Sequence, residues 1–207
     1  MSKKQQISPL RRADLNSDPI AQFERWFDEA SRTDLIQPNT MTLATSTPDG
    51  VPSARMVLMR NFDAKGFVFF TNYESQKGHD LAINPQAALV FYWEPLGRQI
   101  RITGHVERIP ERESDQYFET RPLESRLGAL VSHQSQVIPN RGFLEEDFSK
   151  LRAIYNNQKI SRPSYWGGFR VIPTLIEFWQ HRDHRLHDRF RYTKQKGGTW
   201  LIERLSP

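Results

Sequence analysis

The 207-residue sequence contains no cysteine, which excludes disulfides, thiolate zinc sites, iron–sulfur clusters and cysteine nucleophiles. No apolar run approaches the ~20 residues that a membrane helix needs, and the polar N-terminus does not read as a secretory signal. A chain without disulfides also suits a reducing compartment. We therefore expect a soluble, cytoplasmic protein that has no membrane partner.

Several common functional motifs are missing too. No Gly-x-Gly-x-x-Gly follows a predicted strand and no Gly-x-x-x-x-Gly-Lys occurs, which argues against a Rossmann dinucleotide site and a P-loop. There is also no Gly-x-Ser-x-Gly nucleophile motif and no clear pair of carboxylates. A mononucleotide remains possible, since a few Arg, Lys and Ser groups suffice to bind one phosphate.

Acidic residues are fewer than basic ones, and the formal net charge is +5. Such a balance suits nucleic acid, an anionic lipid surface or a small phosphorylated ligand. The basic residues are interleaved with acidic ones and form no block of the kind seen in nucleic-acid-binding arms. Composition alone leaves the three partners open.

The chain reads as one domain over residues 18–207, preceded by a flexible tail over residues 1–17. Asp18 followed by Pro19 predicts the start of a helix, and apolar residues at positions 20, 23, 26, 27 and 30 share one helical face. Further helices are predicted over residues 77–83, 111–120 and 143–155. Strands are predicted over residues 41–45, 55–60, 67–71, 87–93, 99–108, 168–172, 175–180, 190–193 and 200–204. Because these strands are closely spaced and do not alternate with helices, we expect a mainly β barrel with flanking helices.

Two basic clusters lie at predicted strand ends. Arg55 and Arg60 bracket an apolar strand. Gln76 and Lys77 follow Ser75 where a strand gives way to a helix, and a helix N-terminus favours anions. These groups could bind a phosphate, or they could be ordinary solvated charges at a sheet edge.

A third cluster, Tyr117, Arg121 and Ser125, repeats every four residues. On a single helix the three side chains would share a face suited to a phosphate dianion, although Pro122 interrupts the pattern. The alternative is an exposed arginine at the end of a helix.

His181, His184 and His187 recur at intervals of three. Interleaved arginines would place positive charge beside a metal cation, so we expect no metal site here. The segment could instead be a charged loop, or it could bind an anion or handle protons, since histidine titrates near neutrality.

Taken in order, these segments resemble the pyridoxamine 5′-phosphate oxidase family from about Leu10 to the C-terminus. The segments that carry the resemblance are Arg55 to Arg60, Phe70-Thr71-Asn72, Arg121-Pro122 with Ser125, Gly128-Ala129, Ser132-His133-Gln134-Ser135, Ser164-Tyr165-Trp166-Gly167-Gly168-Phe169-Arg170, Ile176-Glu177-Phe178-Trp179-Gln180, His184-Arg185-Leu186-His187-Asp188-Arg189-Phe190 and Ile202-Glu203-Arg204-Leu205-Ser206-Pro207.

The resemblance implies an FMN-binding split β-barrel, a Greek-key-like antiparallel fold that works as a homodimer with FMN at the subunit interface. Positions that resemble the family's FMN contacts are Arg55, Met56, Val57, Leu58, Met59, Arg60, Phe70, Thr71, Gln76, Lys77, Gln99, Gln134, Ser135, Trp179 and Arg189. Positions that resemble its substrate contacts are Arg60, Tyr117, Arg121, Ser125, Arg185, Leu186 and His187. Arg185 and His187 are the expected catalytic residues, which would orient the substrate ring and assist proton movement.

The implied reaction belongs to vitamin B6 metabolism. Pyridoxamine 5′-phosphate or pyridoxine 5′-phosphate is oxidised to pyridoxal 5′-phosphate, with O2 as the electron acceptor and H2O2 as a product. The alternatives are a related FMN-dependent oxidase of another substrate, such as a phenazine precursor, and a non-catalytic split barrel that only binds flavin. A nucleic-acid-binding barrel is disfavoured, because the aromatic residues are not spaced among basic ones as stacking platforms would be.

Three positions depart from the family pattern. Arg60 stands where the family usually has lysine, and guanidinium does not replace ammonium in every contact. Gln76 stands where arginine is common, which predicts weaker FMN binding that Gln76→Arg should reverse. The N-terminus also lacks the Arg-Arg-x-Tyr segment that covers the substrate in close relatives.

Overall fold

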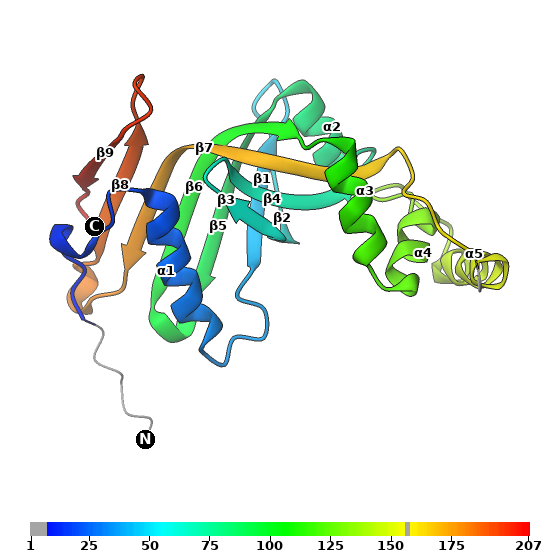
Figure 1. Ribbon diagram of the computed structural model, residues 1–207, viewed down its shortest axis with the longest axis horizontal. Coiled ribbons are helices and arrows are strands. Elements are labelled where there is room, and N and C mark those ends of the chain that lie inside the picture. The colour runs from blue at the N-terminus through cyan, green and yellow to red at the C-terminus, as the bar shows by residue number, and fades with distance from the viewer. Residues whose placement is uncertain (1–7, 156–157) are drawn as a thin grey trace.

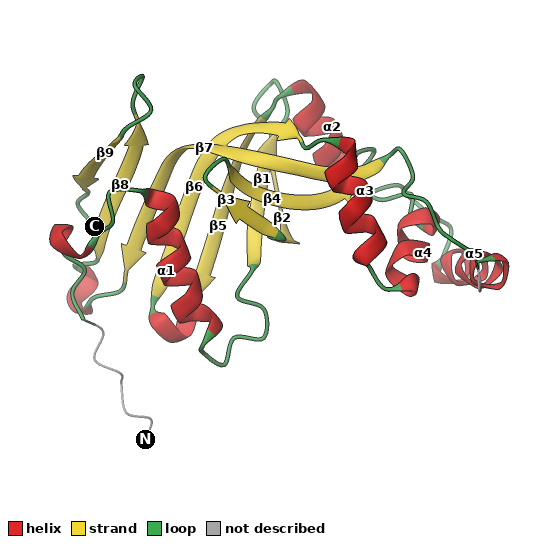
Figure 2. Ribbon diagram, in the orientation of Figure 1, coloured by secondary structure: helices red, strands yellow, loops and turns green. Residues whose placement is uncertain are grey.

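A computed structural model describes residues 8–155 and 158–207, in which nine strands form one antiparallel sheet and five α-helices flank it (Figures 1 and 2). The strands are β1 (Thr40–Ser46), β2 (Pro52–Leu58), β3 (Asn61–Asp63), β4 (Gly66–Asn72), β5 (Gln86–Trp93), β6 (Arg98–Arg108), β7 (Trp166–Gln180), β8 (Asp188–Lys194) and β9 (Trp200–Arg204). The α-helices are α1 (Pro19–Ser31), α2 (Gln76–Ile83), α3 (Glu111–Thr120), α4 (Leu123–Val131) and α5 (Arg141–Ile154). Three short 3-10 turns are η1 (Arg12–Asp14), η2 (Glu94–Leu96) and η3 (Asp183–Arg185).

The long strand β7 organises the sheet. The main strand order is β2-β1-β5-β6-β7-β4-β3. Along its other edge, β7 pairs first with β4, through Trp166 to Val171, and then with β8, through Leu175 to Gln180. The β8–β9 hairpin therefore extends the sheet at one end of the molecule, and the curled sheet forms a half-barrel (Figure 1). The predicted mainly β, split-barrel fold class is confirmed.

Helix α1 covers the main core as its sequence predicts. The Asp18 carboxylate caps the helix by accepting a hydrogen bond from the backbone N–H of Ile20. Phe23 is fully buried and makes edge-on ring contacts with Phe67 and Phe91 of the sheet. One helical face thus anchors α1 on the sheet.

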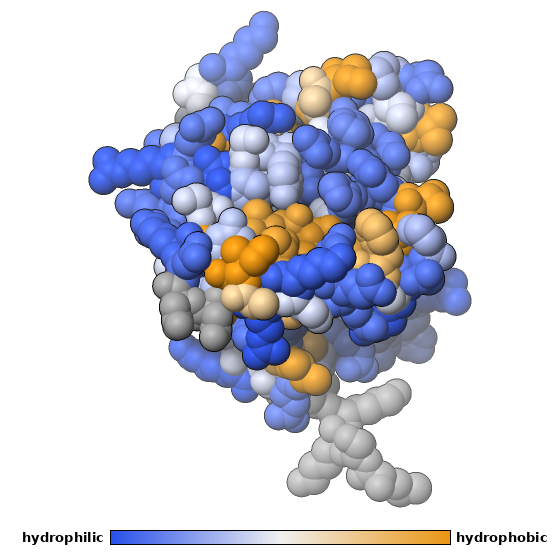
Figure 3. Space-filling model, turned by 90° about the vertical axis from the view of Figure 1, so that its right-hand side faces the viewer, coloured by the Kyte–Doolittle hydropathy of each residue, from blue (hydrophilic) through white to orange (hydrophobic). Residues whose placement is uncertain are grey.

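A second, smaller core lies at the opposite end of the molecule, where α3, α4 and α5 gather (Figure 2). Its buried members are Phe118, Leu127, Ile160 and Trp166. Seen from this end, the surface is largely hydrophilic around a central apolar patch (Figure 3). Because Trp166 begins β7, this helical cluster is attached directly to the central strand.

The structure corrects three strand predictions and adds one helix. The strands expected over residues 168–172 and 175–180 form the single strand β7, and the strand expected to reach Arg60 ends at Leu58. The continuity of β7 follows from a register shift at Thr103/Gly104 of β6, which absorbs the irregularity around Pro173. Helix α4 is not among the predicted helices, because proline ordinarily breaks a helix, whereas Pro122 is the N-cap of a new one.

The described part of the N-terminal segment packs on the body of the protein. Leu10 and Leu15 are buried in the main core, and the backbone N–H of Leu10 donates to the Asp188 carboxylate at 3.1 Å. Residues 1–7 of the expected tail lie outside the described residues. Within the described part of the chain, no helix has the length and apolarity needed to cross a membrane.

The turn between β3 and β4 requires glycine at position 66. Gly66 has φ +137°, and a Cβ atom there would lie 2.0 Å from the carbonyl oxygen of Val171.

We predict that Gly66→Ala lowers the free energy of unfolding by more than about 2 kcal/mol, through strain and collision with β7. Gly197→Ala is the matched control, because its Cβ meets nothing within 4 Å. Urea unfolding of both variants tests this, and equal midpoints would contradict it.

Candidate active site

A cleft of about 860 Å³ opens between the edge strand β2 and the helical end of the molecule. Strand β2 and the C-terminal end of β4 form one wall, the start of α2 forms a second, and α3, α4 and the start of β7 close the rest. The sequence-predicted residues that it brings together are Arg55, Met56, Val57, Leu58, Arg60, Phe70, Thr71, Gln76, Lys77, Tyr117, Arg121, Ser125, Gln134 and Ser135.

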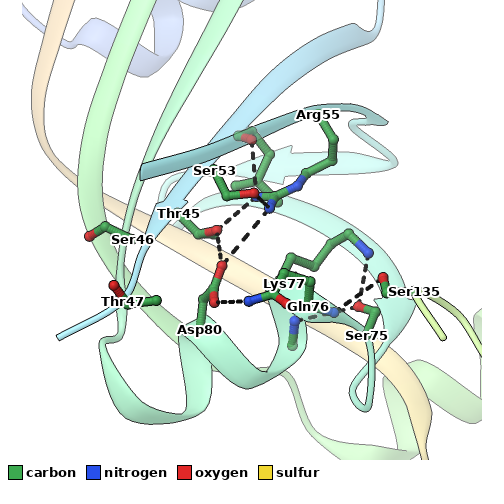
Figure 4. Close-up of polar contacts among 12 residues, drawn as sticks. Thr45, Ser46, Thr47, Ser53, Arg55, Ser75, Gln76, Lys77, Asp80 and Ser135 are labelled. Carbon is green, nitrogen blue, oxygen red and sulfur yellow. Dashed lines mark hydrogen bonds and ion pairs between the residues drawn. The ribbon is translucent and has the colours of Figure 1, made fainter. Parts of the chain in front are cut away.

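One end of the cleft is a polar cradle built around the start of α2 (Figure 4). Ser75 caps the helix by accepting from the backbone N–H of Gly78. The backbone N–H of Gln76 donates to the Ser135 hydroxyl at 3.2 Å. Ser135 has φ 73°, a left-handed conformation that is uncommon outside glycine and that recurs at functional sites. A helix N-terminus of this kind favours an anion.

Arg55 and Lys77 supply the charge of the cradle. Arg55 donates to Ser53 at 2.6 Å and to Thr45 at 2.8 Å, so its guanidinium is held in place. The Lys77 ammonium donates to Ser75 at 2.8 Å and to the side-chain oxygen of Gln134 at 2.7 Å. Burial, together with the Arg55 charge, lowers the pKa of Lys77 to about 8.

A buried carboxylate lies behind these cations. Asp80 is only 4 % exposed, and its two oxygens accept from Thr45 at 2.6 Å and from the Gln76 carboxamide at 2.8 Å. The carboxylate also lies 3.9 Å from the guanidinium of Arg55. Figure 4 shows all of these groups converging on the start of α2.

A second set of donors lies farther along the cleft. Tyr117 belongs to α3, Arg121 is the C-cap of that helix, and Ser125 belongs to α4. The single-helix interpretation of their spacing is therefore wrong, yet all three side chains line the cleft. Nη1 of Arg121 is buried and has no hydrogen-bond partner among the described residues. A buried guanidinium nitrogen without a partner can donate to an acceptor that a ligand brings into the cleft.

Flat aromatic side chains border this second set. The Phe70 and Tyr117 rings stack with centroids 4.0 Å apart, and Trp166 lies nearly parallel to both. The Arg121 guanidinium lies over the Trp166 ring at 4.6 Å. The cleft thus has the volume of a small-molecule site, two groups of phosphate donors and apolar walls between them.

The remaining sequence-predicted residues do not line this cleft. Met59 is buried in the main core. Gln99, Trp179 and Arg189 form a row across β6, β7 and β8, because Gln99 pairs with Trp179 and Trp179 pairs with Arg189. Arg185, Leu186 and His187 lie in the adjoining β7–β8 connection. We call the members of the row and the connection the β8 cluster: Gln99, Trp179, Arg185, Leu186, His187 and Arg189.

The β8 cluster has a fixed geometry of its own. His187 packs against the Trp179 ring with centroids 4.5 Å apart, and its Nδ1 accepts from the backbone N–H of Arg182 at 3.1 Å. Neutral His187 therefore carries its proton on Nε2. Burial and the neighbouring His181, Arg185 and Arg189 lower the pKa of His187, which also favours the neutral ring.

Sequence reasoning missed several residues of the cleft. Ser53 could have been found by strand periodicity, since it lies two residues before Arg55 on β2. Asn72 and Ser132 also line the cleft, as does Trp166, and Asp80 lies behind it. Their positions depend on contacts between elements far apart in the sequence, which leave no local pattern.

The curled antiparallel sheet with helices at one end defines a mainly β split barrel. Residues 27–155 match the sequence profile of the family described as pyridoxamine 5′-phosphate oxidase, and residues 166–207 match a pyridoxine 5′-phosphate oxidase C-terminal dimerisation region. The chain belongs to the pyridoxamine 5′-phosphate oxidase family. It is 56 % identical over 207 residues to the pyridoxine/pyridoxamine 5′-phosphate oxidase of Nostoc punctiforme, covering 100 % of this chain and 97 % of that one. The enzyme of the same name from Cupriavidus pinatubonensis is 53 % identical over 201 residues, covering 97 % and 94 %.

Two solved structures share the fold. PhzG from Burkholderia lata, in complex with tetrahydrophenazine-1-carboxylic acid, aligns with a TM-score of 0.91 at 31 % identity, covering 98 % of this chain and 100 % of that one. A pyridoxamine 5′-phosphate oxidase-related FMN-binding protein from Nostoc punctiforme aligns with a TM-score of 0.74 at 17 % identity, covering 93 % and 100 %. The second likeness confirms the fold alone.

The surroundings of Lys77 predict an unusual titration. In the ligand-free protein, its ammonium should lose its proton with a midpoint near pH 8, because burial disfavours the charged form. Nuclear magnetic resonance of protein labelled at the lysine side chains measures this midpoint, and Lys77→Arg assigns the signal by removing it. A midpoint near the ordinary lysine value of about 10.4 would contradict the prediction.

Proposed function

We propose that the protein is an FMN-dependent oxidase that converts pyridoxamine 5′-phosphate and pyridoxine 5′-phosphate to pyridoxal 5′-phosphate. The single observation that carries the proposal is the presence of two groups of phosphate donors in one cleft, one around Lys77 and one around Arg121. A phosphorylated cofactor and a phosphorylated substrate would each need one. Full-length relatives at more than half identity bear the corresponding enzyme name.

FMN fits the cradle at the start of α2. The helix N-terminus, Arg55, Lys77 and Ser135 would hold its phosphate, and the β2 segment from Met56 to Leu58 would lie along the rest of the cofactor. The chemistry that FMN supplies when bound is acceptance of a hydride from the substrate C4′ carbon and delivery of the two electrons to O2 as H2O2. With the alcohol the aldehyde results directly, whereas with the amine one water enters and ammonia leaves.

Tyr117, Arg121 and Ser125 would hold the substrate phosphate. The partnerless, buried Nη1 of Arg121 supports this assignment, since a phosphate oxygen would satisfy it. Arg60 lies in the same cleft, with its guanidinium 5.8 Å from the Tyr117 ring, and adds a further positive charge. Binding the remote phosphate would fix the reacting carbon in place, which is a proximity effect.

The β8 cluster would complete the site from a second copy of the chain. Trp166 in the cleft and Trp179 in the cluster lie on the same strand, about 40 Å apart along it at a strand rise of ~3.3 Å per residue. Tyr92 pairs with Gln99 on the cluster's row and is 58 % exposed, and Leu186 is 68 % exposed. Exposed apolar groups beside polar ones suit an interface, in agreement with the dimerisation region matched over residues 166–207.

Within that composite site, Arg185 and His187 would orient the substrate ring. His184 and Arg185 have φ values of 57° and 62°, so the turn that presents them holds two consecutive left-handed residues. Neutral His187 offers an N–H donor at Nε2 and remains able to move a proton. The His187 ring cannot swing freely, because Trp179 and the Arg182 backbone hold it.

An anaerobic experiment tests the proposal. Purified protein loaded with FMN should lose its yellow absorbance when pyridoxine 5′-phosphate is added without oxygen, and admitting air should restore the colour with formation of pyridoxal 5′-phosphate. Loaded protein that keeps its colour with both vitamer phosphates would contradict the substrate assignment. Protein that takes up no FMN would contradict the flavoenzyme assignment.

The likeness to PhzG supports a second candidate, a flavin oxidase that acts on a phenazine precursor. Such a substrate carries a carboxylate rather than a phosphate, so it would not require the Tyr117, Arg121 and Ser125 group. Addition of tetrahydrophenazine-1-carboxylic acid to the same anaerobic sample separates the two candidates, since only a substrate removes the yellow absorbance.

The substrate phosphate site predicts a selective effect of Arg121. Arg121→Gln should raise KM for pyridoxine 5′-phosphate about tenfold to a hundredfold, because a charge-assisted hydrogen bond contributes roughly 1.5–3 kcal/mol. Steady-state kinetics measures this, with Arg112→Gln as the control, since Arg112 is an exposed residue of α3 that does not line the cleft. An unchanged KM for the phosphorylated substrate in Arg121→Gln would count against the assignment.

A further inference from the structure

Asp80 places a negative charge inside the wall of an anion-binding cradle. Its carboxylate is buried, lies 3.9 Å from the Arg55 guanidinium and accepts the hydrogen bond that the Gln76 carboxamide donates. Arg55 and Lys77 bring two positive charges to the cradle, and Asp80 cancels one of them. Figure 4 shows the carboxylate on the same side of α2 as Gln76 and facing the guanidinium.

Asp80 has two opposing effects on a bound phosphate. Its hydrogen bonds from Thr45 and Gln76 help to shape the cradle, whereas its charge repels a phosphate dianion. The orientation of Arg55 does not depend on Asp80 alone, because the guanidinium also donates to Ser53, Thr45 and the carbonyl of Leu43. An asparagine would keep the size and still accept from Thr45, but its amide nitrogen would face the Gln76 carboxamide, whose N–H group could no longer donate to it. Asp80→Asn therefore removes the charge and releases the Gln76 N–H group at the same time.

We propose that Asp80 is a specificity-determining residue that sets how tightly the cradle holds the phosphate of the cofactor. It acts by neutralising Arg55 and by drawing the Gln76 amide away from the phosphate. The inference rests on the proposed function, since it takes FMN as the ligand. The inference also gives the neutral residue at position 76 a role, because the Gln76 carboxamide donates a hydrogen bond to the buried Asp80 carboxylate.

The test compares FMN with riboflavin, which has the same ring system and no phosphate. Full-length protein freed of flavin is titrated with each flavin, and quenching of flavin fluorescence gives the two dissociation constants. Asp80→Asn should bind FMN about tenfold more tightly than the wild type and leave the riboflavin constant within about twofold. Gln76→Arg should also favour FMN over riboflavin, because it adds a positive charge against the same carboxylate. If Asp80→Asn does not fold, Asp80→Ala, which also removes the charge, takes its place in the comparison.

Asp63→Asn is the matched control. Asp63 pairs with Arg170 at 2.5 Å and does not line the cleft, so Asp63→Asn makes the same change in net charge outside the cradle. The inference would be overturned if Asp63→Asn tightened FMN binding as much as Asp80→Asn does. It would also be overturned if folded Asp80→Asn bound FMN no more tightly than the wild type, or if its dissociation constant for riboflavin fell as much as that for FMN. If the wild-type protein bound riboflavin and FMN with equal affinity, the inference would likewise be overturned. If the wild-type protein bound neither flavin, the proposed function itself would be overturned.

Discussion

The continuity of β7 is the constraint on which the rest of the structure depends. This one strand of 15 residues begins with Trp166 in the wall of the cleft and ends beside Trp179 in the β8 cluster. It pairs with β6 from Phe169 to Gln180, with β4 at its start and with β8 at its end. A paired strand cannot fold back on itself, so the two groups of family-like residues are held apart within one chain. The proposed site, which uses both groups, would therefore draw on two copies of the chain.

The chemistry of the cleft rests on a balance of buried charge. Arg55 and Lys77 are held by neutral hydroxyl and amide acceptors, which orient them without cancelling their charge. Asp80 is an acidic group in direct contact with this cluster. Burial lowers the pKa of Lys77, and the Asp80 charge opposes that change. The cradle thus stays cationic at neutral pH while its net charge remains small.

Local sequence signals predicted much of the fold because they depend on nearest neighbours. The Asp18-Pro19 start of α1 and the alternation of strand residues follow from capping and side-chain period, and both are confirmed. The spacing of Tyr117, Arg121 and Ser125 picked out three residues that line the cleft, although the single helix it predicted is wrong. Pro122 ends one helix and starts the next, and the chain turns so that all three side chains still meet in the cleft.

The remainder could not be predicted locally. Pro173 reads as the end of a strand, but it lies opposite Gly104, where a Cβ atom would be 2.1 Å from the Ile172 carbonyl oxygen. Only the pairing with a glycine at a register shift lets β7 continue. The position of Asp80 behind Arg55 likewise depends on how α2 packs against β1 and β2, which no spacing along the chain reveals.

Complementation between subunits tests the central claim most directly. Arg55→Ala impairs the cleft and Arg185→Ala impairs the β8 cluster, so each homodimer should have little oxidase activity. When the two variants are mixed and allowed to exchange subunits, each heterodimer should contain one intact site, which would restore about a quarter of the wild-type turnover under random pairing. Activity that never exceeds the sum of the two separate variants, although heterodimers form, would show that each chain builds its site alone and would contradict the account.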